Sequence, residues 1–377
     1  MNSKDMNINE RKTKQVVMIL TNGFDPDVRV YKEAKYLVSK GFGVTILCWD
    51  RDLSRQNPEI ENVEGINVIR FKIESVYGTG AKQIKAFFKY IKACKEYLKN
   101  NSCYYIHCND LDGAITGYLA GKSKANMVFD MHEFYEKGNS VKRKIIRAIV
   151  IFLIKRSKAA LYENNIYLEK EYKSVHDKLF PLRNYPDSGF IQALPKTKSD
   201  KFRIAYHGVV RDQIPEFTAL FEAVKGMQDV MVDINGGGID LKQLQEIAKQ
   251  YTNVSVNGPY DGINESSRLY SKTDLLFCAY NPFDSNYQGD AEVVKYYEAV
   301  STGTPILVTD TIGLATKVKK YNFGITCNTR NADEIRNAIN MIKNNIDLWN
   351  TIHESELNQA YMYSWNKAVK ILDNIYT

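Results

Sequence analysis

The sequence contains no apolar stretch long enough to cross a lipid bilayer. Its longest uninterrupted apolar run, residues 148–154, has seven residues, whereas a spanning helix needs about 20. The polar start, MNSKDMNINERKTKQ, also lacks the apolar core of a secretory signal. We therefore expect the chain to stay in the cytoplasm.

Cysteine is scarce, and its spacing does not suit a zinc site. The six cysteines form no C-x-x-C pair and no cluster with histidine at metal-ligand spacing. Most of them stand beside apolar residues in expected strands or helices. This setting favours buried, reduced thiols that act as small hydrophobic side chains.

The overall composition is that of a globular protein, with 44% hydrophobic and 25% charged residues. It excludes a disordered, collagen-like or coiled-coil chain. A length of 377 residues is too great for one hydrophobic core and suits two domains of ordinary size.

Positive charge is concentrated in two segments of the first half. Residues 140–158 carry seven basic side chains and no acid, which equals the whole net charge of +7. Residues 81–99 carry six lysines at helical spacing against one acid, Glu96. Both segments also contain apolar residues, so one interpretation is weak attachment to an anionic membrane surface. The alternative is a pair of packed helices whose lysines are simply solvated.

Short apolar strands alternate with amphipathic helices along the first half. Strands are expected at residues 15–20, 43–49, 66–71, 104–107, 127–130 and 159–162. Helices are expected at 30–38, 81–99, 114–121 and 141–157, with another beginning at 166. This alternation predicts a parallel sheet covered by helices on both faces.

The second half repeats the theme after an irregular segment. Residues 187–200 directly follow Pro186, contain Gly189 and Pro195, and show no periodicity. These features are typical of an interdomain linker. Strands such as FRIAYHG, MVDIN, LLFCAY and PILVTD then alternate with helices. We predict an α/β protein of two Rossmann-like domains facing across a cleft, residues 1–186 and 201–355. A C-terminal helix, 356–377, is expected to cross back to the first domain.

Candidate ligand-binding residues follow the strands, because ligands bind at the carboxyl ends of parallel sheets. In the first domain, Gly23 and Phe24 form a turn into a helix that suits an anion. Asp110, His132 and Glu133 follow two later strands and bring histidine and carboxylate to one edge. His107 reads equally well as a core histidine or as part of this site. The D-x-D pair Asp25–Asp27 is interpreted as helix capping, so no metal is expected.

In the second domain, the candidates are a cation, glycines and acids near strand ends. Arg211 lies just past the strand that ends at Gly208, where a cation can meet a diphosphate. Gly237 lies in a three-glycine turn that lets a ligand approach the backbone. A loop and the helix after it carry four charged candidates: Asp290, Glu292, Lys295 and Glu298.

These motifs together resemble a known family. From about residue 16 to 342 the chain is similar to the retaining GT-B-fold glycosyltransferases of family four, which include many capsule and lipopolysaccharide enzymes. The resemblance is carried by DVRVYKEAKYLVSKGFGVTIL, HCNDLDG, VFDMHE, LRNYPD, YHGVVR, NGGG and VVKYYEAVSTGTPIL. Each motif alone is loose, but their order and spacing are fairly specific.

The resemblance implies a nucleotide-sugar donor, with UDP the favoured nucleotide, and no further cofactor. The second acid of the family's E-x7-E motif, which holds the ribose, matches Glu298. The first acid, which contacts the transferred sugar, matches Asp290 and departs from the pattern. Either its loop moves in, Glu292 substitutes for it, or the sugar is held differently.

The family clamps the diphosphate with an arginine followed by a lysine. Arg211 matches the arginine, but Glu216 stands at the lysine position, so Lys295 is the candidate replacement. The histidine matching His132 lies beside the acceptor and the donor sugar. The implied reaction keeps the anomeric configuration and needs no enzyme nucleophile. Its acceptor would be a saccharide, a lipid-linked sugar or a protein.

Three other interpretations follow from the same residues. Asp290 and Glu216 allow a catalytically inactive partner subunit, and the fold also serves sugar-nucleotide epimerases. Binding of nucleic acid rests only on the basic segments, and their apolar content argues against it.

Overall fold

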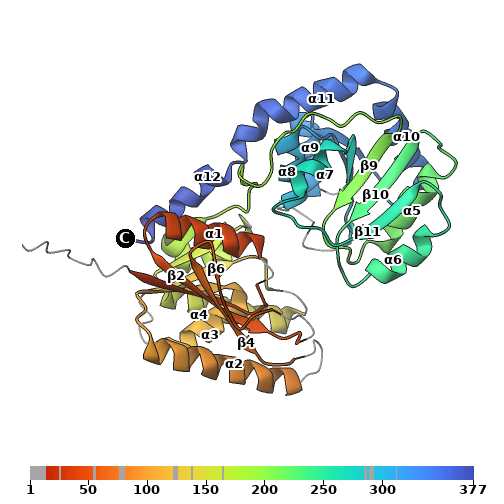
Figure 1. Cartoon of the computed structure of the whole chain (residues 1–377). Helices are drawn as coiled ribbons and strands as arrows, with labels where there is room; N and C mark the ends of the chain where they lie inside the picture. Colours follow the sequence, from red (N-terminus) through yellow and green to blue (C-terminus); the bar gives the residue numbers. More distant parts are fainter. Residues whose placement is uncertain are drawn as a thin grey trace, which may run out of the picture. The chain divides into compact units, whose positions relative to one another are not determined.

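The computed structural model describes residues 14–24, 27–53, 57–75, 81–121, 126–136, 139–163, 165–283, 287, 293–310 and 312–377. The chain forms two compact units, coloured along the sequence in Figure 1. Unit 1 comprises residues up to Leu182 together with Val369–Thr377, and unit 2 comprises Arg183–Ala368. Two α/β units are thus present, as the alternating pattern predicts.

Unit 1 is built on an eight-stranded sheet in the order β3-β4-β2-β1-β5-β6-β7-β8. All neighbouring strands are parallel except β3 and β4. The strands are β1 (Gln15–Leu20), β2 (Gly43–Asp50), β3 (Ile60–Val63), β4 (Ile66–Lys72), β5 (Tyr105–Asn109), β6 (Met127–Met131), β7 (Ala159–Tyr162) and β8 (Leu179–Pro181). The sequence pattern missed β3 and β8, which are short edge strands.

Helices cover both faces of this sheet. Figure 1 shows α1 (Val28–Ser39) on one face and α2 (Ala81–Asn100), α3 (Asp110–Ala120) and α4 (Ser140–Arg156) on the other. Asp27 caps α1, because its side chain accepts a hydrogen bond from the Val30 amide. The capping role predicted for Asp27 is confirmed, whereas Asp25 lies outside the described residues. After β7 the expected α-helix is replaced by two 3-10 segments, Asn165–Leu168 and Lys170–Lys178.

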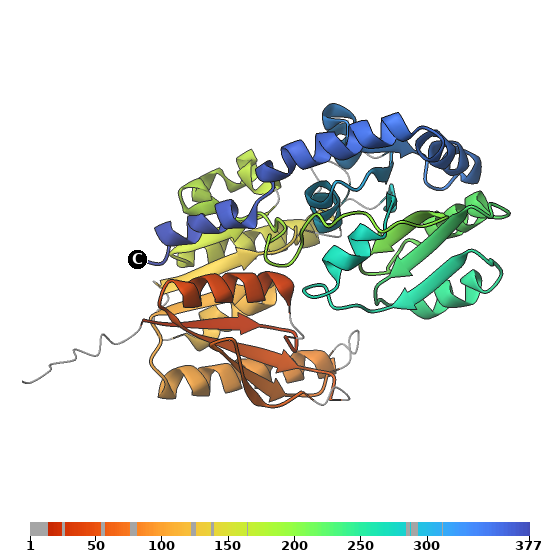
Figure 2. The same cartoon turned by 45° about the horizontal axis from the view of Figure 1, so that its top comes forward.

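The segment Val369–Thr377 packs into unit 1, although it follows unit 2 in sequence. The Tyr376 hydroxyl lies 2.6 Å from Nδ1 of the buried His107. Lys158 donates to the Ile375 carbonyl at 2.7 Å, and the Tyr105 hydroxyl donates to the Thr377 carbonyl at 2.8 Å. Figure 2 shows this segment, at the C-terminal end, against the same unit. The contacts make His107 a core residue, which decides between its two interpretations.

Unit 2 contains a six-stranded parallel sheet in the order β11-β10-β9-β12-β13-β14. Its strands are β9 (Phe202–His207), β10 (Val230–Asn235), β11 (Val254–Gly258), β12 (Leu275–Cys278), β13 (Ile306–Thr309) and β14 (Gly324–Cys327). Alternate residues of β12 face two different cores, as expected for a sheet covered on both sides: Leu275 and Phe277 join one core, Leu276 and Cys278 the other.

The helices of unit 2 divide between these two cores. Side chains of α5 (Ile214–Val224), α6 (Leu241–Ala248) and α10 (Ala332–Lys343) belong to the first core. Side chains of α7 (Ser266–Ser271), α8 (Val294–Thr302) and α9 (Ile312–Tyr321) belong to the second. Residues 182–201, which include the predicted linker 187–200, form no helix or strand.

The C-terminal region is not the single helix that the sequence predicts. It comprises α11 (Ile346–Gln359), a 3-10 turn at Ala360–Met362, α12 (Trp365–Ala368) and a 3-10 segment at Val369–Asn374. The Trp365 amide donates to the Pro186 carbonyl at 3.1 Å instead of to a preceding turn of helix. This tertiary hydrogen bond accompanies the break.

The structure also bears on the predictions about membrane-spanning helices and cysteines. Within the described residues no helix is long and apolar enough to span a membrane. All six cysteines are free, and four are fully buried, so the predicted burial is confirmed for these four.

Candidate active site

A pocket of about 330 Å³ lies at the carboxyl end of the unit 2 sheet. It collects four of the residues predicted from the sequence, Gly208, Arg211, Lys295 and Glu298. The other lining residues are Tyr206, His207, Val209, Gln213, Tyr260, Tyr280, Tyr287, Val293 and Val294. A concave site with a few charged groups among aromatic walls is typical of a small-molecule site.

Lys295 supplies a buried cation to this pocket from the first turn of α8. Its Nζ lies 3.7 Å from the ring centroid of Tyr206 and 5.0 Å from that of Tyr280. Burial lowers the pKa of Lys295 to about 8, and the nearby acids Cys278 and Glu298 offset this only in part. An anionic ligand would relieve the cost of keeping this amine charged.

Gly208 leaves the space that the lysine occupies. Its φ of +145° is unfavourable for other residues, and a Cβ there would lie 2.9 Å from the Lys295 Nζ. Gly236 lies against the same turn, since a Cβ on it would come within 1.7 Å of the Gly208 carbonyl oxygen. Gly237 accepts a hydrogen bond from the Val210 amide at 2.8 Å and does not line the pocket. The glycine turn therefore serves close backbone packing beside the site.

Glu298 lies one turn further along α8 and presents a carboxylate to the pocket. The buried Tyr270 hydroxyl donates to its Oε2 at 3.0 Å, which fixes its orientation. Arg211 is exposed at the pocket's edge. Asp290 and Glu292 lie outside the described residues.

His207, which the sequence did not single out, is a neutral imidazole at the base of the pocket. Burial, with the nearby cations Lys295 and Lys196, lowers its pKa to about 3. The Asn235 side-chain amide donates to Nδ1 at 3.2 Å, which leaves the proton on Nε2, 3.1 Å from the Thr273 hydroxyl. His207 can therefore shape the pocket without adding a second positive charge.

Glu216, which the sequence resemblance aligned with a lysine, is not among the residues that line the pocket. It is fully buried, and its Oε1 accepts a hydrogen bond from the Arg330 Nε at 2.6 Å. Arg330 thereby neutralises the carboxylate and also contacts Asn281. Among the described residues that line the pocket, Lys295 and Arg211 are the cations.

A second group of charged residues stands at the carboxyl edge of the unit 1 sheet. Here His132 lies between two carboxylates, with Nε2 2.7 Å from Asp130 and Nδ1 3.4 Å from Asp110. Asp110 has a φ of +62°, a conformation that aspartate tolerates better than most residues. Although burial opposes it, Asp110 and Asp130 raise the pKa of His132 to about 10.

We expect the His132 imidazole to stay protonated through neutral pH. Its folded-state pKa lies above the unfolded value of about 6.5, so its stabilising contribution is complete below that pH and disappears as the pH rises through about 10. An NMR titration of the histidine ring protons, assigned with His132→Gln, should show no inflection for this residue near pH 6.5. An inflection there would contradict the arrangement.

Asp130 also belongs to a buried charge cluster that the sequence did not reveal. Arg29 donates to both oxygens of Asp130, at 2.8 and 2.6 Å, and also contacts Glu163 and, at 3.1 Å, Glu33. These carboxylates outweigh burial and hold the pKa of Arg29 above its ordinary value. A signal was available, because Arg29 and Glu33 are spaced i,i+4 on the helix face that carries Val30.

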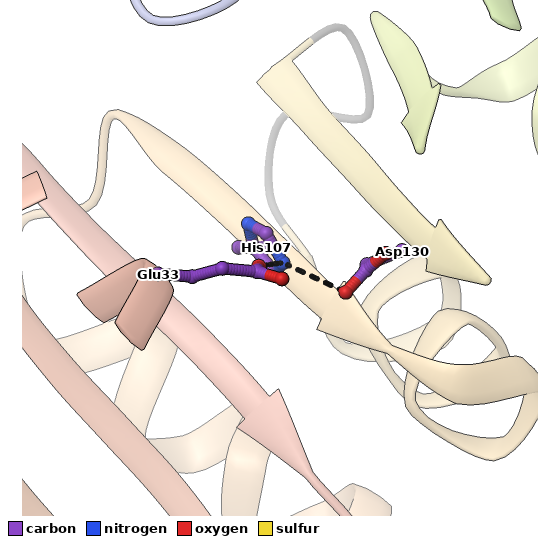
Figure 3. A group of neighbouring side chains, drawn as sticks. All are labelled: Glu33, His107 and Asp130. Atoms are coloured by element: carbon purple, nitrogen blue, oxygen red, sulfur yellow. Dashed lines mark ion pairs between the residues drawn. The ribbon is translucent and has the colours of Figure 1, made fainter. Parts of the chain in front are cut away.

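The buried part of this cluster has the geometry of a small ligand set, as Figure 3 shows for Glu33, His107 and Asp130. The Glu33 Oε2 lies 3.0 Å from Nε2 of His107. However, the Arg29 guanidinium already compensates the two carboxylates, and the other His107 nitrogen meets Tyr376. A cation would have to displace Arg29, so these residues fit an internal charge network better than a metal site.

The remaining predicted residues of unit 1 have other contacts. The Gly23 and Phe24 carbonyls accept hydrogen bonds from Arg70, at 2.7 and 3.0 Å, and the Phe24 amide donates to the Asn22 side chain. Glu133 is exposed, and its carbonyl accepts from the Tyr167 hydroxyl. The structure therefore brings Asp110 and His132 together, whereas the recorded contacts of Gly23 and Phe24 are with Arg70.

Comparison with known proteins gives the fold. No protein-family model and no curated protein matches this sequence. Among solved structures, sucrose-phosphate synthase from Thermosynechococcus elongatus superposes with a TM-score of 0.74 at 16% identity, covering 96% of this chain and 98% of that one. The fold is that of the GT-B glycosyltransferases.

Two further GT-B structures cover nearly the whole chain. WaaG, a glycosyltransferase involved in lipopolysaccharide biosynthesis, has a TM-score of 0.66 at 15% identity, covering 94% of this chain and 99% of that one. HepE from Anabaena, in complex with UDP and glucose, has a TM-score of 0.66 at 14% identity, covering 96% and 98%. At these identities the similarity establishes the GT-B fold alone.

Proposed function

We propose that the chain is a glycosyltransferase that moves a sugar from a nucleotide-diphosphate donor, with UDP favoured, to a saccharide, lipid-linked or protein acceptor. The product would be a cell-surface polysaccharide or glycoconjugate. The observation that carries this proposal is the unit 2 pocket, where Lys295, Arg211 and Glu298 line one cavity at the carboxyl ends of the strands. The GT-B fold and the UDP bound in the similar HepE structure support it.

The charges of the pocket suit the parts of a nucleotide-diphosphate sugar. Lys295 and Arg211 would hold the diphosphate and stabilise the negative charge that grows on it as the sugar leaves. Glu298, fixed by Tyr270, would accept hydrogen bonds from the ribose hydroxyls. We assign Asp290 and Glu292 to the transferred sugar, and we propose no metal for the reaction.

His132 would position the acceptor rather than take its proton. An imidazole that is already protonated at neutral pH cannot act as a general base. The acceptor's proton would then pass to the departing phosphate oxygen on the same face of the sugar, which gives retention of configuration. Asp110, Glu133, Gly23 and Phe24 complete the proposed acceptor side.

Thermal denaturation with a panel of nucleotides and nucleotide sugars tests the donor site. A ligand at 100 times its dissociation constant stabilises the fold by about 2.7 kcal/mol, and we expect one diphosphate nucleotide to do so. Glu298→Ala should abolish the shift. The matched control is Glu246→Ala, which removes an exposed helical glutamate that pairs with Lys249. Binding without any transfer or donor hydrolysis would favour an inactive partner subunit, and product without acceptor would favour an epimerase.

We also propose peripheral attachment of unit 1 to an anionic membrane surface, at the inner face of the membrane. Along one side of α4, four apolar side chains are exposed among basic residues. The apolar side chains are those of Val141, Ile145, Ile149 and Phe152. Such a helix favours the interface of an anionic bilayer. Co-sedimentation with anionic vesicles at low salt should capture the protein, and release at high salt should follow from screening. A protein that stays in the supernatant at low salt would rule the attachment out.

A further inference from the structure

Unit 1 contains a pocket in which four of the seven lining residues are lysines. It has a volume of about 350 Å³ and lies where β4 ends beside the first turns of α2. Lys82, Lys85 and Lys89 come from α2, Lys72 comes from the end of β4, and Glu74 is the one acid among the lining residues. Four amines and one carboxylate leave this pocket with three excess positive charges.

The four lysines outnumber the one acid that lines the pocket. None of them forms an ion pair with an acid in the described part of the chain. Lys82, Lys85 and Lys89 are spaced three and four residues apart, so they lie on one side of the helix and repel one another. A bound anion with several oxygens would remove this repulsion.

Apolar side chains stand exposed on the same two turns of α2. Ile84 and Phe88 are 59% and 60% exposed, and each directly precedes a lysine of the pocket. Single exposed apolar residues are ordinary, but here two of them adjoin a cationic pocket. This combination matches an amphiphile that carries an anionic group next to an apolar chain.

We propose that this pocket binds the phosphate headgroup of a membrane lipid. The four lysines would surround the phosphate oxygens, while Ile84 and Phe88 enter the apolar layer beside it. The inference rests on the proposed membrane attachment and deepens it by naming the site and the recognised group. It makes recognition local to the first half of α2 rather than spread over every basic residue of unit 1.

Vesicle binding by the full chain tests the site. Phosphatidylcholine vesicles with and without phosphatidic acid provide the probe. The variant Lys82→Gln/Lys85→Gln/Lys89→Gln should bind the acidic vesicles about tenfold more weakly or worse. The control Lys92→Gln/Lys95→Gln/Lys99→Gln removes the same charge from the same helix outside the pocket, and should lose less than about threefold. Equal losses in the two variants, or no binding by the unaltered chain, would overturn the proposal.

A second variant separates a lipid headgroup from free phosphate. Ile84→Ser/Phe88→Ser should weaken vesicle binding while leaving unchanged the part of inorganic phosphate binding that Lys82→Gln/Lys85→Gln/Lys89→Gln removes. Unchanged vesicle binding would refute insertion of the apolar pair and hence the lipid. The nucleotide-induced thermal shift is measured on every variant. Because the donor pocket lies in unit 2, its retention shows that failure of the lipid site is not failure of the glycosyltransferase proposal.

Discussion

Replacing Lys295 with methionine is expected to lower kcat/KM for the nucleotide sugar by about 100- to 1,000-fold. Methionine is similar in length and can remain between the rings of Tyr206 and Tyr280, so the packing of α8 is retained. What disappears is a buried cation in a water-poor pocket, where an interaction with diphosphate is strongest. Steady-state kinetics, or donor hydrolysis if the acceptor is unknown, measures the loss.

The matched control is Lys242→Met, which removes an exposed lysine from α6. A Lys295→Met enzyme as active as this control would show that Arg211 alone serves the diphosphate. The diphosphate would then be held by one cation, because the residue that the sequence resemblance aligned with a second cation is the buried Glu216.

The pH dependence of donor affinity should report the same amine. With the pKa of Lys295 near 8, the charged form is lost as the pH rises through that value, and affinity falls with it. The contribution of this amine to stability should move in the opposite direction. Its folded-state pKa lies below the ordinary 10.5, so between these values the unfolded chain holds more protons on Lys295, and the contribution of Lys295 to the free energy of unfolding rises with pH. The contribution of His132 falls over the same range, up to about pH 10. In Lys295→Met the fall in affinity should be absent, and the slope of the free energy of unfolding against pH between about 8 and 10.5 should be less positive than in the unaltered chain.

Replacing Arg29 with methionine should lower the free energy of unfolding by about 3 to 5 kcal/mol. The change removes the guanidinium that compensates Asp130 and Glu163, and both carboxylates stay in place, Asp130 in β6 and Glu163 directly after β7. Removing one partner of a buried ion pair is costly because the remaining charge has no water. Urea denaturation followed by circular dichroism measures the loss.

The double variant Arg29→Met/Asp130→Asn provides the control for this mechanism. It removes the positive charge and one of the stranded negative charges, so it should be more stable than Arg29→Met alone. A double variant that loses the sum of the two single effects would mean that the residues stabilise unit 1 independently. Asp130→Asn also removes a partner of His132, so its imidazole pKa should fall.

The sequence predicts most strands correctly because their signal is local. Runs such as VVMIL and LLFC are short, apolar and bounded by turns, and each forms a buried strand. The four pocket residues Gly208, Arg211, Lys295 and Glu298 were also predictable, because parallel strands bring their ends to one edge. In contrast, the tyrosines that line the pocket come from separate parts of the sequence, and no regular spacing relates them.

Long-range contacts explain what the sequence did not predict. Arg29 meets Asp130 across 101 positions, and no periodic pattern links a charged residue in a helix to a strand so distant. The break before α12 depends on the Pro186 carbonyl, which lies in the irregular segment far upstream. His132 was predicted as a site residue from its position, but its raised pKa follows from its distances to Asp110 and Asp130, which the sequence does not give.

The late docking of Val369–Thr377 has a consequence for synthesis on the ribosome. When Leu182 has been added to the growing chain, the first unit still lacks the residue that meets His107, and the 186 residues 183–368 must be made before Val369. At translation rates of about 5 to 20 residues per second, this interval lasts about 10 to 40 seconds. During this interval, Nδ1 of His107 lacks its contact with the Tyr376 hydroxyl. Final closure of the first unit therefore waits until the second unit has been translated.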